Sequence, residues 1–146
     1  MSDFPAEFLR GVSNENDFLD SEGLPKQSLF QFSKVPRAKD GNYDLSITWR
    51  DNEEAVSIIM NQQKEKGGIQ FKAGLAVLSR EKLDSMIVIG DPMCREDLSY
   101  ERDKKPENKY HGNIVHKPEG KERQAIFRAI LAMSFVGIIK QTNPSE

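Results

Sequence analysis

Hydrophobic and polar residues alternate most regularly between residues 43 and 50. The hydrophobic positions are Tyr43, Leu45, Ile47 and Trp49, and the polar positions are Asp44, Ser46, Thr48 and Arg50. A period of two that is rich in aromatic and β-branched residues predicts a half-buried β-strand. Tyr43 and Trp49 lie on its inward face, so we expect them in the core rather than in a binding surface.

A second hydrophobic run precedes this strand. Leu29, Phe30 and Phe32 predict a strand over residues 28–34, which ends before Pro36. The segment Asp40-Gly41-Asn42 is typical of a turn, because Gly and Asn adopt positive φ at little cost. The two strands are therefore expected to form a hairpin with a long loop.

After the second strand the hydrophobic period becomes that of a helix. Asp51 and Glu54 have the spacing of a capping box. A buried stripe follows at helical spacing: Ala55, Val56, Ile58 and Ile59. Gly67-Gly68 is typical of a helix end, so the pattern predicts a helix over residues 52–66.

Three more segments have strand-like patterns. Alternation predicts a strand over residues 69–78, and short hydrophobic runs predict strands at 86–89 and within 110–117. Ser79 is expected to open a short helical turn between the first two.

The C-terminal part contains the most hydrophobic helix, predicted over residues 120–134. Ile126, Ile130 and Met133 line one face of it. Three further residues widen this face: Phe127, Ala129 and Leu131. Residues 134–139 fit either a continued helix or a final strand, and both alternatives stay open.

Together these elements predict a single α+β domain over residues 27–146. We expect a mixed or mainly antiparallel sheet of four to six strands, with two main helices on one face. Residues 1–26 are expected to form an N-terminal arm, with a turn or two of helix after Pro5, because turn-forming residues interrupt the segment repeatedly. Residues 91–109 are expected to form a long polar loop outside the body, since dense charge and two prolines leave little to build a core.

Composition and charge narrow the class of protein. The chain has 146 residues, of which 21 are basic and 23 acidic, with a net charge of −2. Nucleic-acid binding is disfavoured, because such proteins usually carry a basic surplus. The only cysteine, Cys94, fits a reducing compartment. The N-terminal residues lack a signal-peptide pattern and the longest apolar run is too short to cross a bilayer, so we expect a cytoplasmic protein without a membrane partner.

One histidine is the main candidate for acid–base chemistry. His111 follows the polar loop and precedes Gly112, where a backbone can approach a ligand closely. An imidazole titrates near neutrality without special tuning. Asp91 follows a predicted buried strand, where open α/β sheets often place functional groups. The structural alternative is that His111 only bonds a main-chain carbonyl at the start of a strand.

Other charged residues extend this candidate site. Positive side chains in and after the loop are expected to bind a phosphate, with an aromatic neighbour: Arg95, Arg102, Lys109 and Tyr110. If the strands before them are adjacent, several carboxylates form an acidic cluster: Asp44, Asp51, Asp91 and Asp103. We expect no metal site, because no set of ligands has zinc-like spacing, and we expect no cofactor.

The segment around His111 resembles a pattern in small uncharacterised bacterial proteins. Here the segment is Pro106-x-Asn108-x-Tyr110-His111-Gly112-Asn113-Ile114, after Asp91-Pro92 and before the last helix. Those proteins carry an Asn-Pro-x-His-Ala-x-Ile-like segment. In this chain Lys109 stands in place of the proline and Gly112 in place of the alanine. The resemblance covers the last third of the chain, implies no known activity, and favours His111 as a position to test.

Two functions from different classes fit these observations. The favoured one is a non-catalytic protein-binding accessory module of the immunity or adaptor type. It would dock another protein through the N-terminal arm and the 91–109 loop. The alternative is a small enzyme acting on a phosphate-containing or nucleotide-like substrate, with His111 as acid or base and Asp91 or Asp44 assisting. Self-association of the chain stays open.

Overall fold

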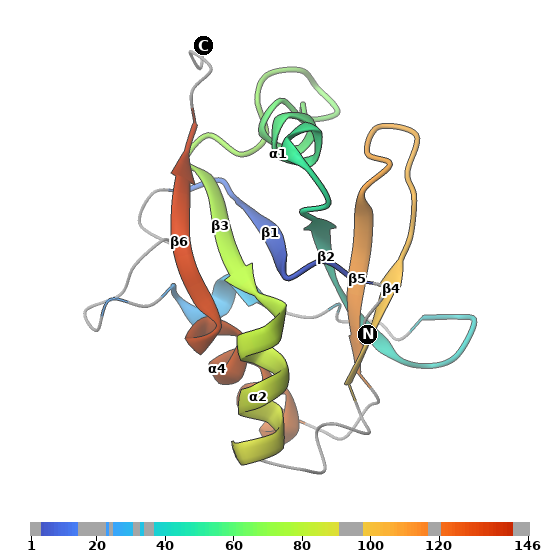
Figure 1. The fold of residues 1–146 in the computed structure, drawn as a ribbon. Coiled ribbons are helices and arrows are strands. Elements are labelled where there is room, and N and C mark those ends of the chain that lie inside the picture. The colour runs from blue at the N-terminus through green and yellow to red at the C-terminus, as the bar shows by residue number, and fades with distance from the viewer. Residues whose placement is uncertain are drawn as a thin grey trace.

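The computed structural model describes residues 4–14, 23, 25–30, 33, 37–90, 98–116 and 121–141. Within these ranges the chain forms one antiparallel β-sheet with helices packed on it, which confirms the predicted single α+β domain (Figure 1). In this part of the chain no helix has the length and apolar character needed to cross a membrane.

Six described strands make up the sheet. They are β1 (Glu7–Val12), β2 (Tyr43–Trp49), β3 (Gly74–Ser79), β4 (Leu98–Arg102), β5 (His111–His116) and β6 (Phe135–Lys140). Their order across the sheet is β4-β5-β2-β1-β3-β6, and each neighbouring pair is antiparallel. The predicted strands at 43–49 and within 110–117 are confirmed as β2 and β5. Strand β6 resolves the alternatives for residues 134–139.

Strand β1 corrects the prediction for the N-terminal segment. Residues 7–12 are neither a peripheral arm nor a helix, because they pair along their whole length with β3 and at one end with β2. Phe8 and Leu9 are fully buried and belong to the cores on opposite faces of the sheet. A strand that is covered on both faces lacks simple alternation, which is why the pattern did not predict it.

Helices cover both faces of the sheet. On one face, α4 (Lys121–Met133) and the 3-10 helix η2 (Gln27–Phe30) pack against the larger core, which contains Trp49 and Phe127. On the other face, α1 (Glu53–Met60) packs through Ile59 and Met60 against residues of β1 and β3. The prediction that the first and last helices cover the same face is therefore wrong. Successive residues of β1 and β3 point to opposite faces, so each face has a core of its own.

Helix α1 is shorter than predicted. Asn52, rather than Asp51, caps it, and its side chain accepts a hydrogen bond from the Ala55 N–H at 3.1 Å. The helix ends at Met60, where the Asn61 side chain donates to the Ser57 carbonyl at 2.8 Å. Gly67-Gly68 does not end the helix. Both glycines have positive φ in a turn that is closed by a bridge between Gln63 and Ile69.

The region after α1 contains a longer helix than predicted. Strand β3 begins at Gly74, later than the predicted start at residue 69. The predicted strand at 86–89 is wrong, because these residues belong to α2 (Arg80–Gly90). The Ser79 hydroxyl accepts a hydrogen bond from the Lys82 N–H at 3.0 Å and caps this helix as expected. A hydrophobic run of four residues does not distinguish a strand from a turn of helix.

Two other predicted segments are also corrected. Residues 27–30 form η2 instead of the first part of a strand at 28–34, although the Ser33 N–H still donates to the Asp44 carbonyl of β2 at 2.8 Å. Within the predicted polar loop at 91–109, residues 98–102 form β4, which returns through a turn to β5. Tyr100 packs edge-on against Trp49, with ring centroids 5.7 Å apart, so this hairpin is part of the folded body. Residues 91–97 lie outside the described ranges.

Candidate anion-binding cleft

A cleft opens where strands β1 and β2 diverge. The two strands pair only at Phe8↔Trp49 and Leu9↔Thr48, at one end of β1. The cleft has a volume of about 450 Å³, which is within the range typical of small-ligand sites. It is lined by both strands, η2, α1 and the turn between β4 and β5. Its polar lining includes Arg10, Ser46, Thr48, Lys105, Asn108 and His111.

Arg10 occupies the gap between the two strands. Its Nε–H donates to the Leu29 carbonyl of η2 at 3.0 Å, and an Nη1–H donates to the Ser46 carbonyl of β2 at 2.7 Å. These bonds fix the plane of the guanidinium group at the cleft. Because a guanidinium carries five N–H donors, further donors remain for another acceptor.

The charge of Arg10 is not balanced within the described part of the chain. Its two hydrogen-bond acceptors are neutral carbonyls, and no described carboxylate forms an ion pair with it. Burial lowers the pKa of Arg10 to about 10, which still leaves the group charged at neutral pH. Arg10 is half-buried and lines the cleft. A partly desolvated positive charge with no carboxylate beside it favours an anion at this position.

His111 lines the same cleft from β5. Its Nδ1 lies 2.9 Å from the main-chain oxygen of Asp103 and 3.6 Å from that residue's carboxylate. A carbonyl only accepts hydrogen bonds, so Nδ1 carries the proton, and in the neutral ring the lone pair is on Nε2. His111 thus bonds a main-chain carbonyl, as the structural alternative predicted, and it also lines a cleft; its acid–base role stays a prediction.

Asn108 holds the turn between β4 and β5 against β2. It is buried, and its Nδ2–H donates to the Thr48 hydroxyl at 2.9 Å, while its Oδ1 accepts from the Tyr110 N–H at 3.0 Å. Lys105 and His111 lie in or next to this turn and line the cleft. Asn108 therefore positions one wall of the cleft.

Among the described residues, the other predicted binding residues, Arg102, Lys109 and Tyr110, do not line this cleft. Arg102 forms a two-bond ion pair with Asp51, with both N···O distances at 2.8 Å. Lys109 lies 2.7 Å from the Glu54 carboxylate, which also accepts from the Tyr110 hydroxyl at 2.6 Å. These contacts fasten the β4–β5 hairpin to the start of α1. Asp91 and Arg95 lie outside the described ranges, so their predicted roles stay predictions.

The predicted acidic cluster does not form among the carboxylates that the structure describes. Asp44 faces Arg37 at 3.9 Å, Asp51 pairs with Arg102, and Asp103 lies 3.2 Å from Lys105. Across the described ranges, no group of three or more His, Cys, Asp or Glu side chains could hold a metal ion.

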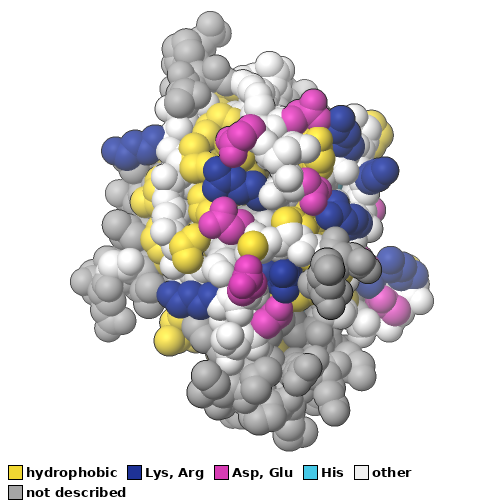
Figure 2. Space-filling view, in the orientation of Figure 1, with side chains coloured by type: hydrophobic (Ala, Val, Ile, Leu, Met, Phe, Trp, Pro, Cys, Tyr) yellow, Lys and Arg dark blue, Asp and Glu magenta, His cyan; other side chains and the backbone are white. Residues whose placement is uncertain are grey.

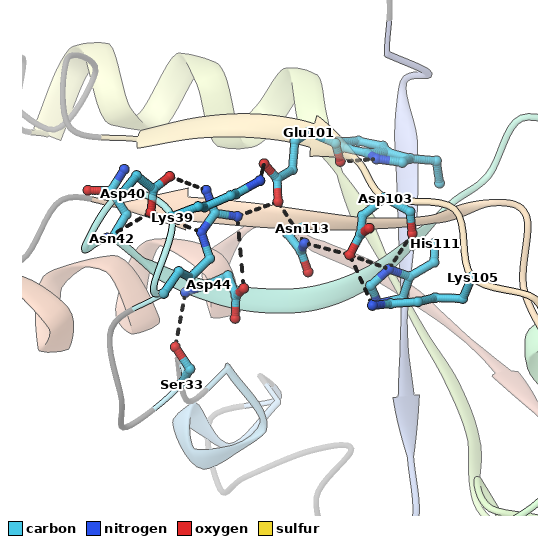
Figure 3. A network of polar contacts seen from close by, with 12 residues as sticks. Ser33, Lys39, Asp40, Asn42, Asp44, Glu101, Asp103, Lys105, His111 and Asn113 are labelled. Atoms are coloured by element: carbon cyan, nitrogen blue, oxygen red, sulfur yellow. Dashed lines mark hydrogen bonds and ion pairs between the residues drawn. The ribbon is translucent and has the colours of Figure 1, made fainter.

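A network of charged residues lies beside the cleft on β4 and β5 (Figure 3). Figure 3 shows Glu101, Asn113, Asp103 and His111 side by side along this hairpin. The segment before β2, with Lys39 and Asp40, lies next to Glu101. The Glu101 carboxylate accepts from the Asn113 amide at 2.7 Å and from Arg37, which also binds Asp40. This network orders the surface next to His111.

The network lowers the pKa of some of its carboxylates, including Asp40 and Glu101. The hydrogen bond from Arg37 lowers the pKa of Asp40 to about 2. Burial alone would raise the pKa of Glu101, but hydrogen bonds from Asn113 and Arg37 outweigh it, and the pKa lies below its ordinary value.

Acid is therefore expected to weaken the fold through this network. A carboxylate with a lower pKa in the folded state stabilises the fold above its unfolded pKa, and the contribution is lost as pH falls through the folded pKa. We expect the melting temperature to fall between about pH 5 and about pH 2. Arg37→Met should lower the melting temperature at neutral pH and flatten this decline, as measured by circular dichroism. Curves for Arg37→Met and wild type that run parallel would contradict the assignment. Lys66→Met removes an exposed charge and serves as the control.

Arg10 is the candidate site residue that sequence reasoning missed. A signal was present, because Arg10 is the only charge in the run Phe8-Leu9-Arg10-Gly11-Val12. In a strand, residues 8, 10 and 12 share one side, and Phe8 and Val12 are buried there. An arginine on the buried side of a strand therefore indicates a charged group in a partly buried position.

Comparisons of the chain with protein-family models, with curated proteins and with solved structures give no match.

Proposed function

We propose that the protein binds a small phosphate-bearing ligand in the cleft between β1 and β2, with Arg10 as the main contact to the phosphate. The observation that carries this proposal is the guanidinium of Arg10, which lines the cleft and has no described carboxylate partner. A bound anion would supply the missing negative charge.

The chemistry of the cleft suits a phosphate group. Arginine binds phosphate oxygens through its planar fork of N–H donors. Lys105, whose ammonium lies 3.2 Å from the Asp103 carboxylate, also lines the cleft, and Ser13 and Ser28 add hydroxyl groups to the lining. On the face that Figure 2 shows, Lys and Arg side chains are interspersed with Asp and Glu side chains among the described residues. Selection of an anion is thus expected from the cleft itself rather than from a broad positive surface.

A phosphate-bearing ligand is also what the alternative prediction from the sequence requires, namely a small enzyme with a phosphate-containing or nucleotide-like substrate. His111 lies in the cleft, and its acid–base role stays a prediction. The protein-binding function also stays a prediction. Some residues proposed to carry it have internal partners, since Glu7–Val12 forms a strand within the sheet and Lys109 and Tyr110 both contact Glu54.

Thermal unfolding with inorganic phosphate tests the proposal. A ligand that binds only the folded state stabilises it, by about 2.7 kcal/mol when its concentration is a hundred times its Kd. We expect phosphate to raise the melting temperature above that in chloride of equal ionic strength. Arg10→Met should abolish this increase, whereas Lys82→Met, which removes an exposed charge on α2, should retain it.

Phosphorus NMR of inorganic phosphate with the folded wild-type protein measures binding independently of unfolding. Arg10→Lys keeps the charge but loses the planar fork, so its binding should be intermediate. Equal phosphate effects on wild type and Arg10→Met would overturn the proposal, as would unperturbed phosphate resonances with wild type.

A further inference from the structure

We infer that the ligand is a phosphate ester with a neutral, hydrogen-bonding organic part, namely a nucleotide or a sugar phosphate. This inference rests on the proposed binding of phosphate at Arg10. It follows from a second cavity next to the first, which has a different chemical character.

The second cavity lies along the outer side of α1 and has a volume of about 650 Å³. Three residues line both cavities: Gln62, Gln70 and Glu107. The two cavities are therefore adjoining parts of one groove. Ser57, Asn61 and Gln63 add further uncharged polar side chains to the second part. Hydroxyl and carboxamide groups recognise neutral polar ligands, because they offer donors and acceptors without charge.

A pair of glutamines marks the junction between the two parts. The Gln62 side-chain amide donates to the Gln70 side-chain oxygen at 2.8 Å, and the Gln70 main-chain N–H donates to the Gln62 carbonyl at 2.9 Å. The side-chain bond uses one oxygen and one N–H. Gln62 Oε1 and the Gln70 amide nitrogen have no other partner in the described part of the chain. Because the two amides can exchange roles, either orientation leaves an acceptor on one glutamine and a donor on the other. A donor beside an acceptor matches the edge of a nucleobase or the hydroxyl groups of a sugar.

The charges along the groove set the orientation of the ligand. Arg10, Lys105 and His111 line only the first part, and Glu54 lines only the second. Glu107 lies at the junction. Glu54 is paired with Lys109, and no described positive side chain lines the second part, so a phosphate group is expected at Arg10 in the first part. This leaves the second part for the neutral group, where the Glu107 carboxylate at the junction accepts hydrogen bonds from hydroxyl or amino groups. The groove thus disfavours a ligand with a second phosphate at its other end.

Calorimetric titration of the full-length protein separates this inference from the proposed function. The probes are inorganic phosphate, the ribonucleoside monophosphates of adenine, guanine, cytosine and uracil, and glucose 6-phosphate. We expect at least one ester to bind about tenfold more tightly than inorganic phosphate, since each tenfold gain corresponds to about one good hydrogen bond. A preference for a nucleotide identifies a base, and a preference for glucose 6-phosphate identifies hydroxyl recognition.

Gln70→Leu should reduce the ratio of ester affinity to phosphate affinity to about one; because Gln70 also lines the first part, this ratio, measured on the same variant, is the readout. Retained phosphate binding also shows that the variant is folded, and Gln62→Leu provides a second variant with the same expected result. Lys82→Met should leave both affinities unchanged. If phosphate binds and no ester binds more tightly, or if both glutamine variants keep the ester preference, the inference is overturned and the proposed function stands. If neither phosphate nor any ester binds, both are overturned.

Discussion

Gly112→Ala is expected to destabilise the fold by about 3 kcal/mol, because overpacking and a broken hydrogen bond act together at this site. A Cβ atom at residue 112 would lie 2.1 Å from Trp49 Nε1 and 2.5 Å from the Glu101 carbonyl oxygen. Both distances are far below van der Waals contact, so one of these groups has to move.

Neither group moves easily. The Trp49 indole N–H donates to the Glu101 carbonyl at 3.1 Å, so a methyl group placed between them disrupts this bond. The indole is fully buried and packs against the rings of Phe4, Phe8 and Tyr100, with centroids between 4.7 and 5.8 Å away. The carbonyl belongs to β4, which pairs with β5 next to Gly112. Relief of the overlap therefore disturbs either the aromatic core or the sheet.

Urea unfolding of Gly112→Ala and Gly137→Ala measures this effect against a matched control. Gly137 lies in β6, and a Cβ atom there has no atom within 4 Å. Its replacement should be neutral or stabilise by up to about 1 kcal/mol, because alanine restricts the unfolded chain. Similar free energies of unfolding for the two variants would show that residue 112 has room for a side chain.

At Gly112, packing replaces ligand binding as the reason for a glycine. The sequence favoured a close approach of a ligand to this glycine. The structure places the Trp49 indole there instead, so the glycine is needed for packing. His111, its neighbour, does lie at a cleft. One of two adjacent residues thus belongs to the candidate site, and the other belongs to the core.

Regular alternation predicted some strands well and missed others for a physical reason. Strand β2 was predicted to within one residue of its observed bounds, because its sequence alternates without interruption between hydrophobic and polar residues. Strand β4 was missed, because it is an edge strand whose charged residues, such as Glu101 and Arg102, belong to ion pairs that only the fold creates. Local pattern also does not say which face of a sheet a helix covers, so α1 was assigned to the wrong face.

The candidate site was predictable only in part, because its residues are distant in sequence. His111 stood out as one of two histidines in the chain. Arg10 acquires its role from carbonyls of Leu29 and Ser46, and these contacts depend on how β1 and β2 diverge. The junction of Gln62 and Gln70 likewise depends on the turn that follows α1. No spacing along the chain marks such contacts.

Phe127→Ala is expected to cost about 3 to 5 kcal/mol, the usual range for removing a buried aromatic side chain. Phe127 is 1% exposed and packs with the larger core, where its ring centroid lies 5.0 Å from that of His116. The sequence had centred the buried face of α4 on Ile126, Ile130 and Met133, with Phe127, Ala129 and Leu131 widening it. In the structure Ile130 is buried, whereas Ile126 is 39% and Met133 is 50% exposed. The buried face is therefore rotated toward Phe127 and Leu131.

Alanine substitutions at positions 126, 127 and 133 distinguish the two faces in one urea-unfolding experiment. Ile126→Ala and Met133→Ala should each cost less than about 1 kcal/mol, because partly exposed side chains lose little contact on truncation. A larger loss at Ile126 than at Phe127 would restore the face that the sequence predicted. Since Phe127 does not line the cleft, Phe127→Ala should bind phosphate as wild type does wherever it remains folded. Loss of phosphate binding in the folded variant would instead show that the core under α4 and the cleft at Arg10 are coupled.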